Sequence, residues 1–365
     1  MFPAVVRSIL PTMKTYIAVL ILSAFAAYFL TPLARWLALR WGAMDLPGKR
    51  KIHSHPVPRL GGLAVFGGFC SPWAFFYLLD NLVTARFHSY EKLFLALMLG
   101  AAAMLALGIY DDLKGANASK KFVVQIITAT GLYYGGFQIT VLSNPFGPPF
   151  ELGWLSLPAS VLWIVAITNA INLLDGIDGL VAGVTACIAL ALAIINILAG
   201  NVIVALLTLC LAGSCLGFLP HNFSPARIFL GDSGSLFIGI VLACIGILSL
   251  FKAATVTFIV VPLVLFGLPI YDTLSVMWGR LRRGAPVFQA DKSHVHHRLL
   301  KLGLNQQQAA TILYGITLLL GAVGVFFSLE QSPVTILLVS GLVLLLALIT
   351  ARAWLRRRNQ NGNGD

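Results

Sequence analysis

The chain has 365 residues, of which 58% are hydrophobic and only 10% are charged, and its mean hydropathy is +0.89. Soluble globular proteins carry about 25% charged residues, so this composition excludes an ordinary soluble domain and indicates an integral membrane protein. The formal net charge of +12 is typical of a membrane orientation signal, and nucleic acid is not an expected partner.

Runs of about 20 apolar residues predict eleven membrane-spanning helices. In chain order they cover residues 16–38, 61–79, 92–110, 121–138, 157–174, 180–199, 202–219, 234–250, 255–278, 309–329 and 333–350. Nothing resembles the alternating strands of a membrane β-barrel. The expected fold is an all-α polytopic membrane bundle, with residues 1–358 as one integral membrane domain and residues 359–365 as a disordered polar tail.

The basic residues orient this bundle. Of the 25 Lys and Arg, 20 fall on the side that holds the C-terminus. Because cytoplasmic loops are enriched in Lys and Arg, that side is expected to be cytoplasmic and the N-terminus to face outward. The three Glu residues then lie outside, whereas the aspartates of the polar segments lie inside.

Adjacent carboxylates, Asp111 and Asp112, follow the third predicted span. Two neighbouring carboxylates repel each other, so one of them is expected to have a cation nearby or a raised pKa. A metal ligand, a general base and a solvated helix end are all compatible with this pair.

The most specific pattern is Asn169-Ala-Ile-Asn172-Leu-Leu-Asp175-Gly-Ile-Asp178-Gly179. The spacing of three places the first three polar side chains along one stripe of a helix. The glycines then interrupt the helix and permit a close approach by a ligand. Helix–helix hydrogen bonding is an alternative for the two Asn residues, but it does not account for two aspartates among glycines.

The segment Gly231-Asp232-Ser-Gly-Ser235 opens the eighth predicted span. Free backbone N–H groups at a helix N-terminus favour anions, and an aspartate beside phosphate requires a bridging cation such as Mg²⁺. Ordinary helix capping is the alternative.

The longest predicted cytoplasmic loop, residues 279–308, contains His294, His296 and His297, followed by Arg298. Zinc binding is one interpretation, but no Cys accompanies them. Imidazoles in basic surroundings suit a diphosphate better.

Taken together, these segments resemble the polyprenyl-phosphate N-acetylhexosamine-1-phosphate transferase family. The likeness runs from Asp45 to about Gly303. Its five motifs are DxPxxRKxHxxPxPRxGG, DDxxxxxxxxKxxxQ, NxxNxxDGIDGLxxG, GDSGSxxxG and ADKxHxHHRLL. The HxHH pattern is similar to the N-acetylglucosamine-1-phosphate branch, which initiates cell-surface glycan synthesis such as lipopolysaccharide or teichoic acid. The alternative, the phospho-N-acetylmuramoyl-pentapeptide branch, is expected to have three consecutive His, and here Val295 interrupts the run.

The resemblance implies that undecaprenyl phosphate attacks the β-phosphorus of UDP-N-acetylglucosamine and releases UMP, at the cytoplasmic face of a bacterial inner membrane. It implies Mg²⁺, with Mn²⁺ as a substitute, and permits a homodimer. It assigns the metal to Asp232 and Asp175, with Asp178 as an alternative ligand, and base or lipid-phosphate positioning to Asp111 or Asp112. The resemblance implies substrate binding by Lys51, Lys121, Asn169, Asn172, Asn222 and Arg298. It implies that the diphosphate or the sugar is held by His294, His296 and His297.

Direct attack and a covalent aspartyl intermediate are both compatible with these residues. Direct attack is favoured because a lipid phosphate is already a good nucleophile. A secondary transporter would carry its ionisable groups near the bilayer midplane. In this sequence Asp272 is the only acidic residue that lies well inside a predicted span, and it lies near the inner end of that span. A non-catalytic scaffold would not need the Asp and His clusters.

Overall fold

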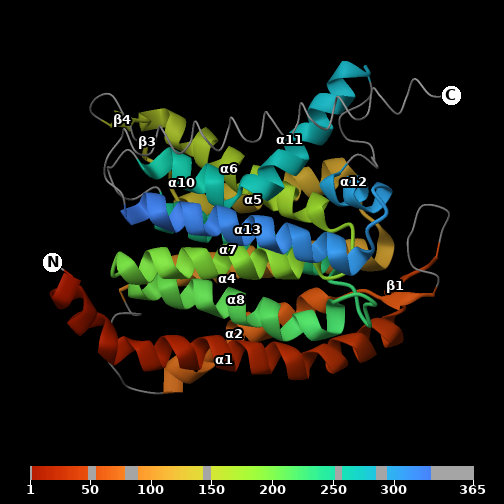
Figure 1. The fold of residues 1–365 in the computed structure, drawn as a ribbon, viewed down its shortest axis with the longest axis horizontal. Coiled ribbons are helices and arrows are strands. Elements are labelled where there is room, and N and C mark those ends of the chain that lie inside the picture. The colour runs from red at the N-terminus through yellow and green to blue at the C-terminus, as the bar shows by residue number, and fades with distance from the viewer. Residues whose placement is uncertain are drawn as a thin grey trace.

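The computed structural model describes residues 2–47, 55–78, 89–142, 149–250, 257–284 and 294–329. These residues fold almost entirely into helices that run side by side along the long axis of the molecule (Figure 1). Seven of the described helices are long and apolar enough to cross a membrane. The structure is therefore that of a helical protein of the multi-pass membrane type.

The N-terminal half forms five long helices. They are α1 (Phe2–Trp41), α2 (Gly61–Leu78), α4 (Glu91–Lys114), α5 (Ala118–Tyr134) and α6 (Ser156–Leu174). Two short antiparallel hairpins join them: β1 (Met44–Asp45) with β2 (Val57–Pro58), and β3 (Val141–Leu142) with β4 (Phe150–Glu151). A 3₁₀ turn, η1 (Gly153–Leu155), precedes α6.

The C-terminal half continues the bundle. Its helices are α7 (Leu180–Leu198), α8 (Val202–Asn222), α9 (Gly231–Leu250), α10 (Thr257–Leu265), α11 (Gly267–Arg282), α12 (Val295–Lys301) and α13 (Gln306–Leu329). The β1–β2 hairpin and α12 lie at one end of the molecule, and β3, β4 and the N-terminus lie at the other (Figure 1).

The first ten predicted spans each coincide with helix in the structure. The predicted separation at Gly200–Asn201 is present, because α7 ends at Leu198 and Gly200 has φ +73°. The ninth predicted span is interrupted at Phe266, between α10 and α11. The eleventh, residues 333–350, lies outside the described residues, so the count of eleven stays a prediction.

Helix α9 is the centre of the bundle, and close backbone contacts surround its start. A Cβ at Gly108 of α4 would lie 2.3 Å from Ser233 Cα, and one at Gly62 of α2 would lie 2.3 Å from Gly234 N. Only glycine permits this approach. The three helices therefore converge where the sequence places its Gly-Asp-Ser-Gly-Ser segment.

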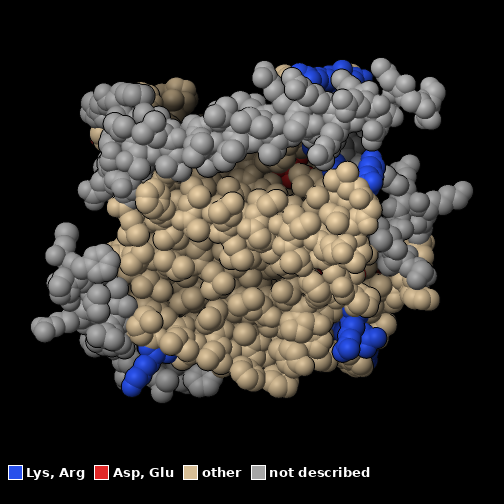
Figure 2. Space-filling view, in the orientation of Figure 1, with Lys and Arg blue, Asp and Glu red and all other residues tan. Residues whose placement is uncertain are grey.

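The outer helices expose apolar side chains. Phe29 on α1 and Leu319 on α13 are each 66% exposed. Figure 2 shows a broad central band without Lys or Arg on this face, with the basic residues toward the ends. An uncharged apolar band of this kind is expected of a surface that faces lipid.

Candidate active site

A cavity of about 290 Å³ opens at the end of the bundle that carries β1 and α12. It collects residues from all five of the sequence motifs. The predicted site residues among its lining are Asp112, Asn172, Asp175, Asp178, Asn222, Asp232 and His297.

Asp112 holds the N-terminus of α9. Its Oδ1 accepts a hydrogen bond from Asp232 N and its Oδ2 accepts one from Ser233 N, both at 3.0 Å. Gly231 has φ +73°, and a Cβ there would lie 2.5 Å from the Asp112 carboxylate. The free N–H groups of α9 are thus satisfied by the end of α4, which fixes the position of the neighbouring Asp232.

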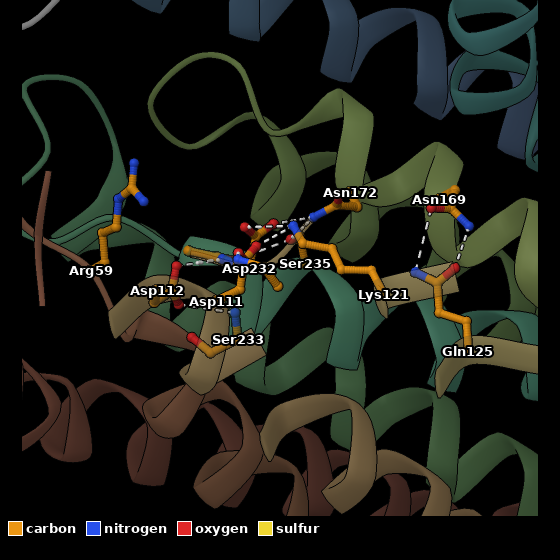
Figure 3. A network of polar contacts seen from close by, with 12 residues as sticks. Arg59, Asp111, Asp112, Lys121, Gln125, Asn169, Asn172, Asp232, Ser233 and Ser235 are labelled. Atoms are coloured by element: carbon orange, nitrogen blue, oxygen red, sulfur yellow. Dashed lines mark hydrogen bonds and ion pairs between the residues drawn. The ribbon is translucent and has the colours of Figure 1, made fainter. Parts of the chain in front are cut away.

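The Asp232 carboxylate lies in a dense polar network (Figure 3). Lys121 Nζ is 3.1 Å from its Oδ2 and also forms an ion pair with Asp111. Asn172 Nδ2 donates to its Oδ1 and to Ser235 Oγ, the latter at 2.8 Å. One Lys ammonium therefore bridges two carboxylates that the sequence places 121 residues apart on different helices.

Asn169 points elsewhere. Its Nδ2 donates to Gln125 Oε1 at 2.7 Å and to Val165 O at 2.8 Å. Figure 3 shows this amide pair set apart from the Asp232 network. Asn169 is thus in a helix–helix contact between α5 and α6, outside the cavity lining, and its predicted substrate role stays a prediction.

Asp175 and Asp178 lie in the break between α6 and α7. Asp178 Oδ2 accepts from Ala226 N at 3.0 Å, so this carboxylate orders the segment that follows α8. Asp175 faces the cavity. Surrounding protein and the nearby Asp232 and Asp112 raise its pKa to about 8, since an enclosed carboxylate among like charges resists ionisation.

Asp272 of α11 organises the histidine segment. It is 1% exposed, its Oδ2 is 2.7 Å from His294 Nδ1, and its Oδ1 accepts from Val295 N at 2.6 Å. A single buried carboxylate thus holds both His294 and the first turn of α12.

The three histidines lie in series from this carboxylate to the cavity, with the first two rings stacked and the last two tilted by 47°. His294 and His296 have ring centroids 5.6 Å apart, and His296 and His297 are 4.4 Å apart. Burial lowers the pKa of His296 to about 3, so this ring is neutral at physiological pH. Neither of its nitrogens has a hydrogen-bond partner among the described residues, and a Cβ at Gly176 would lie 2.1 Å from its Nε2.

The remaining predicted residues are spread around the site. Asn222 lines the cavity, and its Nδ2 donates a hydrogen bond to Ile228 O at 3.0 Å. Arg298 Nη2 donates to Ser275 Oγ at 3.2 Å, toward α11. Lys51 lies outside the described residues.

Several site residues were not singled out from the sequence. Arg59 forms an ion pair with Asp45, and both line the cavity, as does Gln306. Asp45 and Arg59 are both positions of the motif DxPxxRKxHxxPxPRxGG, so the sequence did contain a signal for these two site residues. Gln306 stands in a plain Gln-Gln-Gln run, and no local pattern distinguishes it.

The donor set fits Mg²⁺ when phosphate completes the coordination. Among the described ranges, no group of three or more His, Cys, Asp or Glu side chains converges as a self-sufficient metal site. Asp175 and Asp232 nevertheless line the same cavity. Mg²⁺ in phosphoryl-transfer sites is commonly held by one or two carboxylates together with substrate phosphates and water.

The long apolar helices define a helical protein of the membrane type. The cavity at one end of these helices is lined by carboxylates and an imidazole, which is a set of side chains compatible with a phosphate substrate. Residues 94–250 match the model of glycosyl transferase family 4. A probable undecaprenyl-phosphate N-acetylglucosaminyl 1-phosphate transferase of Bacillus subtilis is 38% identical over 295 residues, covering 80% of each chain. The protein belongs to glycosyl transferase family 4.

Two further relatives are similar over most of the chain. A decaprenyl-phosphate N-acetylglucosaminephosphotransferase of Mycolicibacterium smegmatis is 34% identical over 370 residues, covering 93% of this chain and 88% of the relative. A phospho-N-acetylmuramoyl-pentapeptide-transferase of a Synechococcus species is 30% identical over 328 residues, covering 83% of this chain and 88% of the relative.

Proposed function

We propose that this protein transfers N-acetylglucosamine 1-phosphate from UDP-N-acetylglucosamine to undecaprenyl phosphate, forming undecaprenyl-diphospho-N-acetylglucosamine and UMP. The observation that carries the proposal is the convergence of Asp175, Asp178, Asp232 and His297 on one cavity at the end of apolar helices. The names of the B. subtilis and M. smegmatis relatives support the same donor sugar.

In the proposed reaction, a phosphate oxygen of the lipid forms a bond to the β-phosphorus, and the bond from that phosphorus to the bridging oxygen of UMP breaks. Phosphoryl transfer depends mainly on positioning and charge neutralisation. Asp175 and Asp232 would hold Mg²⁺, which neutralises charge on the diphosphate when bound.

The chain's own residues would then position the reactants. Asp112 fixes the start of α9, and through it Asp232. Lys121 is held between Asp111 and Asp232, where its ammonium would meet a phosphate oxygen. His297 is the member of the histidine series that lines the cavity, so it would contact the diphosphate or sugar.

We also propose that the cavity faces the cytoplasm of a bacterial inner membrane, in an eleven-span topology with the N-terminus outside. The concentration of Lys and Arg on the sequence segments at this end supports that orientation. Labelling with a membrane-impermeant maleimide tests it. Trp154→Cys, at the opposite end, should react in intact cells, whereas Leu302→Cys should react only in inside-out membranes; the reverse result would contradict the topology.

The test of function is UMP release by the purified full chain with undecaprenyl phosphate, Mg²⁺ and separate UDP-sugars. Turnover with UDP-N-acetylglucosamine that stops with EDTA and with Asp232→Asn supports the proposal. Glu151→Gln is the matched control, because this exposed carboxylate lies on β4 at the far end. Turnover only with UDP-N-acetylmuramoyl-pentapeptide would assign the protein to the alternative branch, and no turnover by folded protein would reject a transferase.

A further inference from the structure

A second cavity lies between α1 and the end of α8, outside the site described above. Its volume is about 300 Å³, at the lower end of the range for small-ligand pockets, about 300–1,000 Å³. Arg35 and Trp36 of α1 line one side, and His221 and Arg227 line the other. The two helices pack closely along their length, because α1 backbone fits against Gly213 and Gly217 of α8.

The charged side chains that line this cavity are both arginines. Arg35 and Arg227 both line it, and neither forms an ion pair with a carboxylate in the part of the chain that the structure describes. No Asp or Glu is among its described lining residues. His221 Nε2 is buried there without a hydrogen-bond partner among the described residues. Two guanidinium groups without a counter-charge favour an anion, and the planar fork of a guanidinium suits phosphate oxygens.

The surroundings of the cavity are those of a membrane interface. Trp36 is 50% exposed and carries Arg40 over its ring at 5.2 Å. Aromatic and basic side chains of this kind lie at the level of lipid headgroups. Leu33 and Leu39 beside it on α1 are also exposed, which suits acyl chains. Figure 2 shows basic side chains at this end of α1, next to the uncharged band.

From these observations we infer that the second cavity binds the phosphate headgroup of an anionic phospholipid. A free phosphate compound would share the chemistry of the two arginines, but it would leave the exposed Trp36 and Leu39 without a partner. The combination of two arginines in one cavity and an adjoining apolar surface therefore favours a lipid.

The position of this site matters because the two cavities share a wall. His221 and Ile228 line the second cavity, whereas Asn222, Phe229 and Leu230 line the first. The segment between them is tied together by Asn222 Nδ2 to Ile228 O at 3.0 Å and Arg227 N to His221 O at 2.9 Å. A lipid headgroup on Arg227 would thus contact the same ten-residue segment, residues 221–230, that forms one side of the candidate active site.

Native mass spectrometry of the full chain in detergent tests this inference with three probes: phosphatidylglycerol, phosphatidylcholine and free glycerol 1-phosphate. We expect phosphatidylglycerol to be retained in preference to phosphatidylcholine. The double variant Arg35→Gln/Arg227→Gln should weaken its binding about tenfold. Arg282→Gln is the matched control, because Arg282 also lies over an exposed tryptophan, Trp278 at 5.0 Å, but does not line this cavity.

Each other result would overturn the inference. Equal retention of the two lipids, or equal loss in Arg282→Gln, would mean general attraction to a basic surface. Competition by glycerol 1-phosphate at the concentrations at which the lipid binds would identify a soluble phosphate ligand instead. Should the double variant fail to fold, Leu39→Trp, which fills the cavity without changing charge, must weaken phosphatidylglycerol binding, or the site is not there.

Discussion

Asp272 on α11 lies 2.7 Å from His294 Nδ1 and simultaneously accepts a hydrogen bond from Val295 N. The carboxylate belongs to a helix of the bundle, whereas His294 begins the segment that leads to the cavity. The relationship connects the position of the three histidine rings to one buried carboxyl group. A hydrogen bond to a charged group contributes about 1.5–3 kcal/mol, so its loss should be measurable.

Asp272→Asn should reduce turnover of the proposed reaction about 10-fold to 100-fold, because the amide holds the His294 ring less strongly and the three histidine rings shift. UMP release under saturating substrate is the measurement. Thr273→Val is the control, since the neighbouring hydroxyl is buried without a partner among the described residues. Equal rates for the two variants would show that the Asp272–His294 contact does not position the histidines.

Asp112→Ala should destabilise the protein by about 2 kcal/mol, because two N–H groups at the buried start of α9 lose their acceptor. Thermal unfolding in a neutral detergent measures this change. Asn117→Ala is the comparison: Asn117 caps exposed α5 by accepting from Lys120 N at 2.9 Å, and its loss should cost about 1 kcal/mol or less. If the two variants unfold alike, the Asp112 cap is not a stabilising contact.

Gly176→Ala should impair activity without unfolding the bundle. The added Cβ would lie 2.1 Å from His296 Nε2, so the ring must move and displace the neighbouring rings of His294 and His297. Gly315→Ala is the matched substitution, because nothing lies within 4 Å of that Cβ position in α13. We expect at least a tenfold loss of turnover for Gly176→Ala, an effect of about 1.4 kcal/mol, and none for Gly315→Ala. Unchanged turnover in both would remove His296 from the site.

The raised pKa of Asp175 predicts a pH dependence of stability in the metal-free protein. In the unfolded chain an Asp has a pKa near 3.9, whereas in the cavity the pKa of Asp175 is about 8. Between these values the folded state binds more protons than the unfolded state, so stability should fall as pH rises through this window. The melting temperature in EDTA at pH 5 to 9 measures it.

Asp175→Asn is the variant that tests the origin of this slope. It removes the ionising group and should flatten the decline, whereas Glu151→Gln at the exposed far end should leave it unchanged. A decline of the same steepness in Asp175→Asn would assign the effect to other groups.

Much of the helical arrangement was accessible from the sequence, since an apolar run of about 20 residues has few alternatives to a helix in lipid. The break between α10 and α11 was missed, because hydropathy does not register an interruption among apolar residues. Pro262 and Pro269 were the available signals. Helix α1 begins at Phe2 instead of near residue 16, because a helix continues past the apolar segment that identifies it.

The sequence was sufficient to identify most residues of the candidate site, but not which of them form hydrogen bonds or ion pairs with each other. Spacing of three predicted that Asn172 and Asp175 share a stripe, yet only tertiary packing places Asn172 against Asp232 and Asn169 against Gln125. The same holds for Lys121, which bridges two carboxylates from different helices. Asp272 appeared in the sequence only as an isolated acid in a span, since its partner His294 lies beyond a long loop.

The shared wall of the two cavities predicts a lipid effect on catalysis, which rests on both the proposed reaction and the proposed phospholipid site. Residues 221–230 connect Arg227 with Asn222, Phe229 and Leu230 of the first cavity. In nanodiscs, wild-type turnover should rise severalfold when phosphatidylglycerol replaces phosphatidylcholine, because a bound headgroup restricts this segment and pre-organises the site.

Arg35→Gln/Arg227→Gln should turn over at the phosphatidylcholine rate in both lipids, and Arg282→Gln should respond as the wild type does. Because the lipid itself is assayed separately by mass spectrometry, the possible failures are distinguishable. Lipid binding without a change in turnover would show that a lipid in the second cavity does not affect the first cavity through residues 221–230. An equal response of wild type and double variant would place the lipid effect elsewhere on the protein.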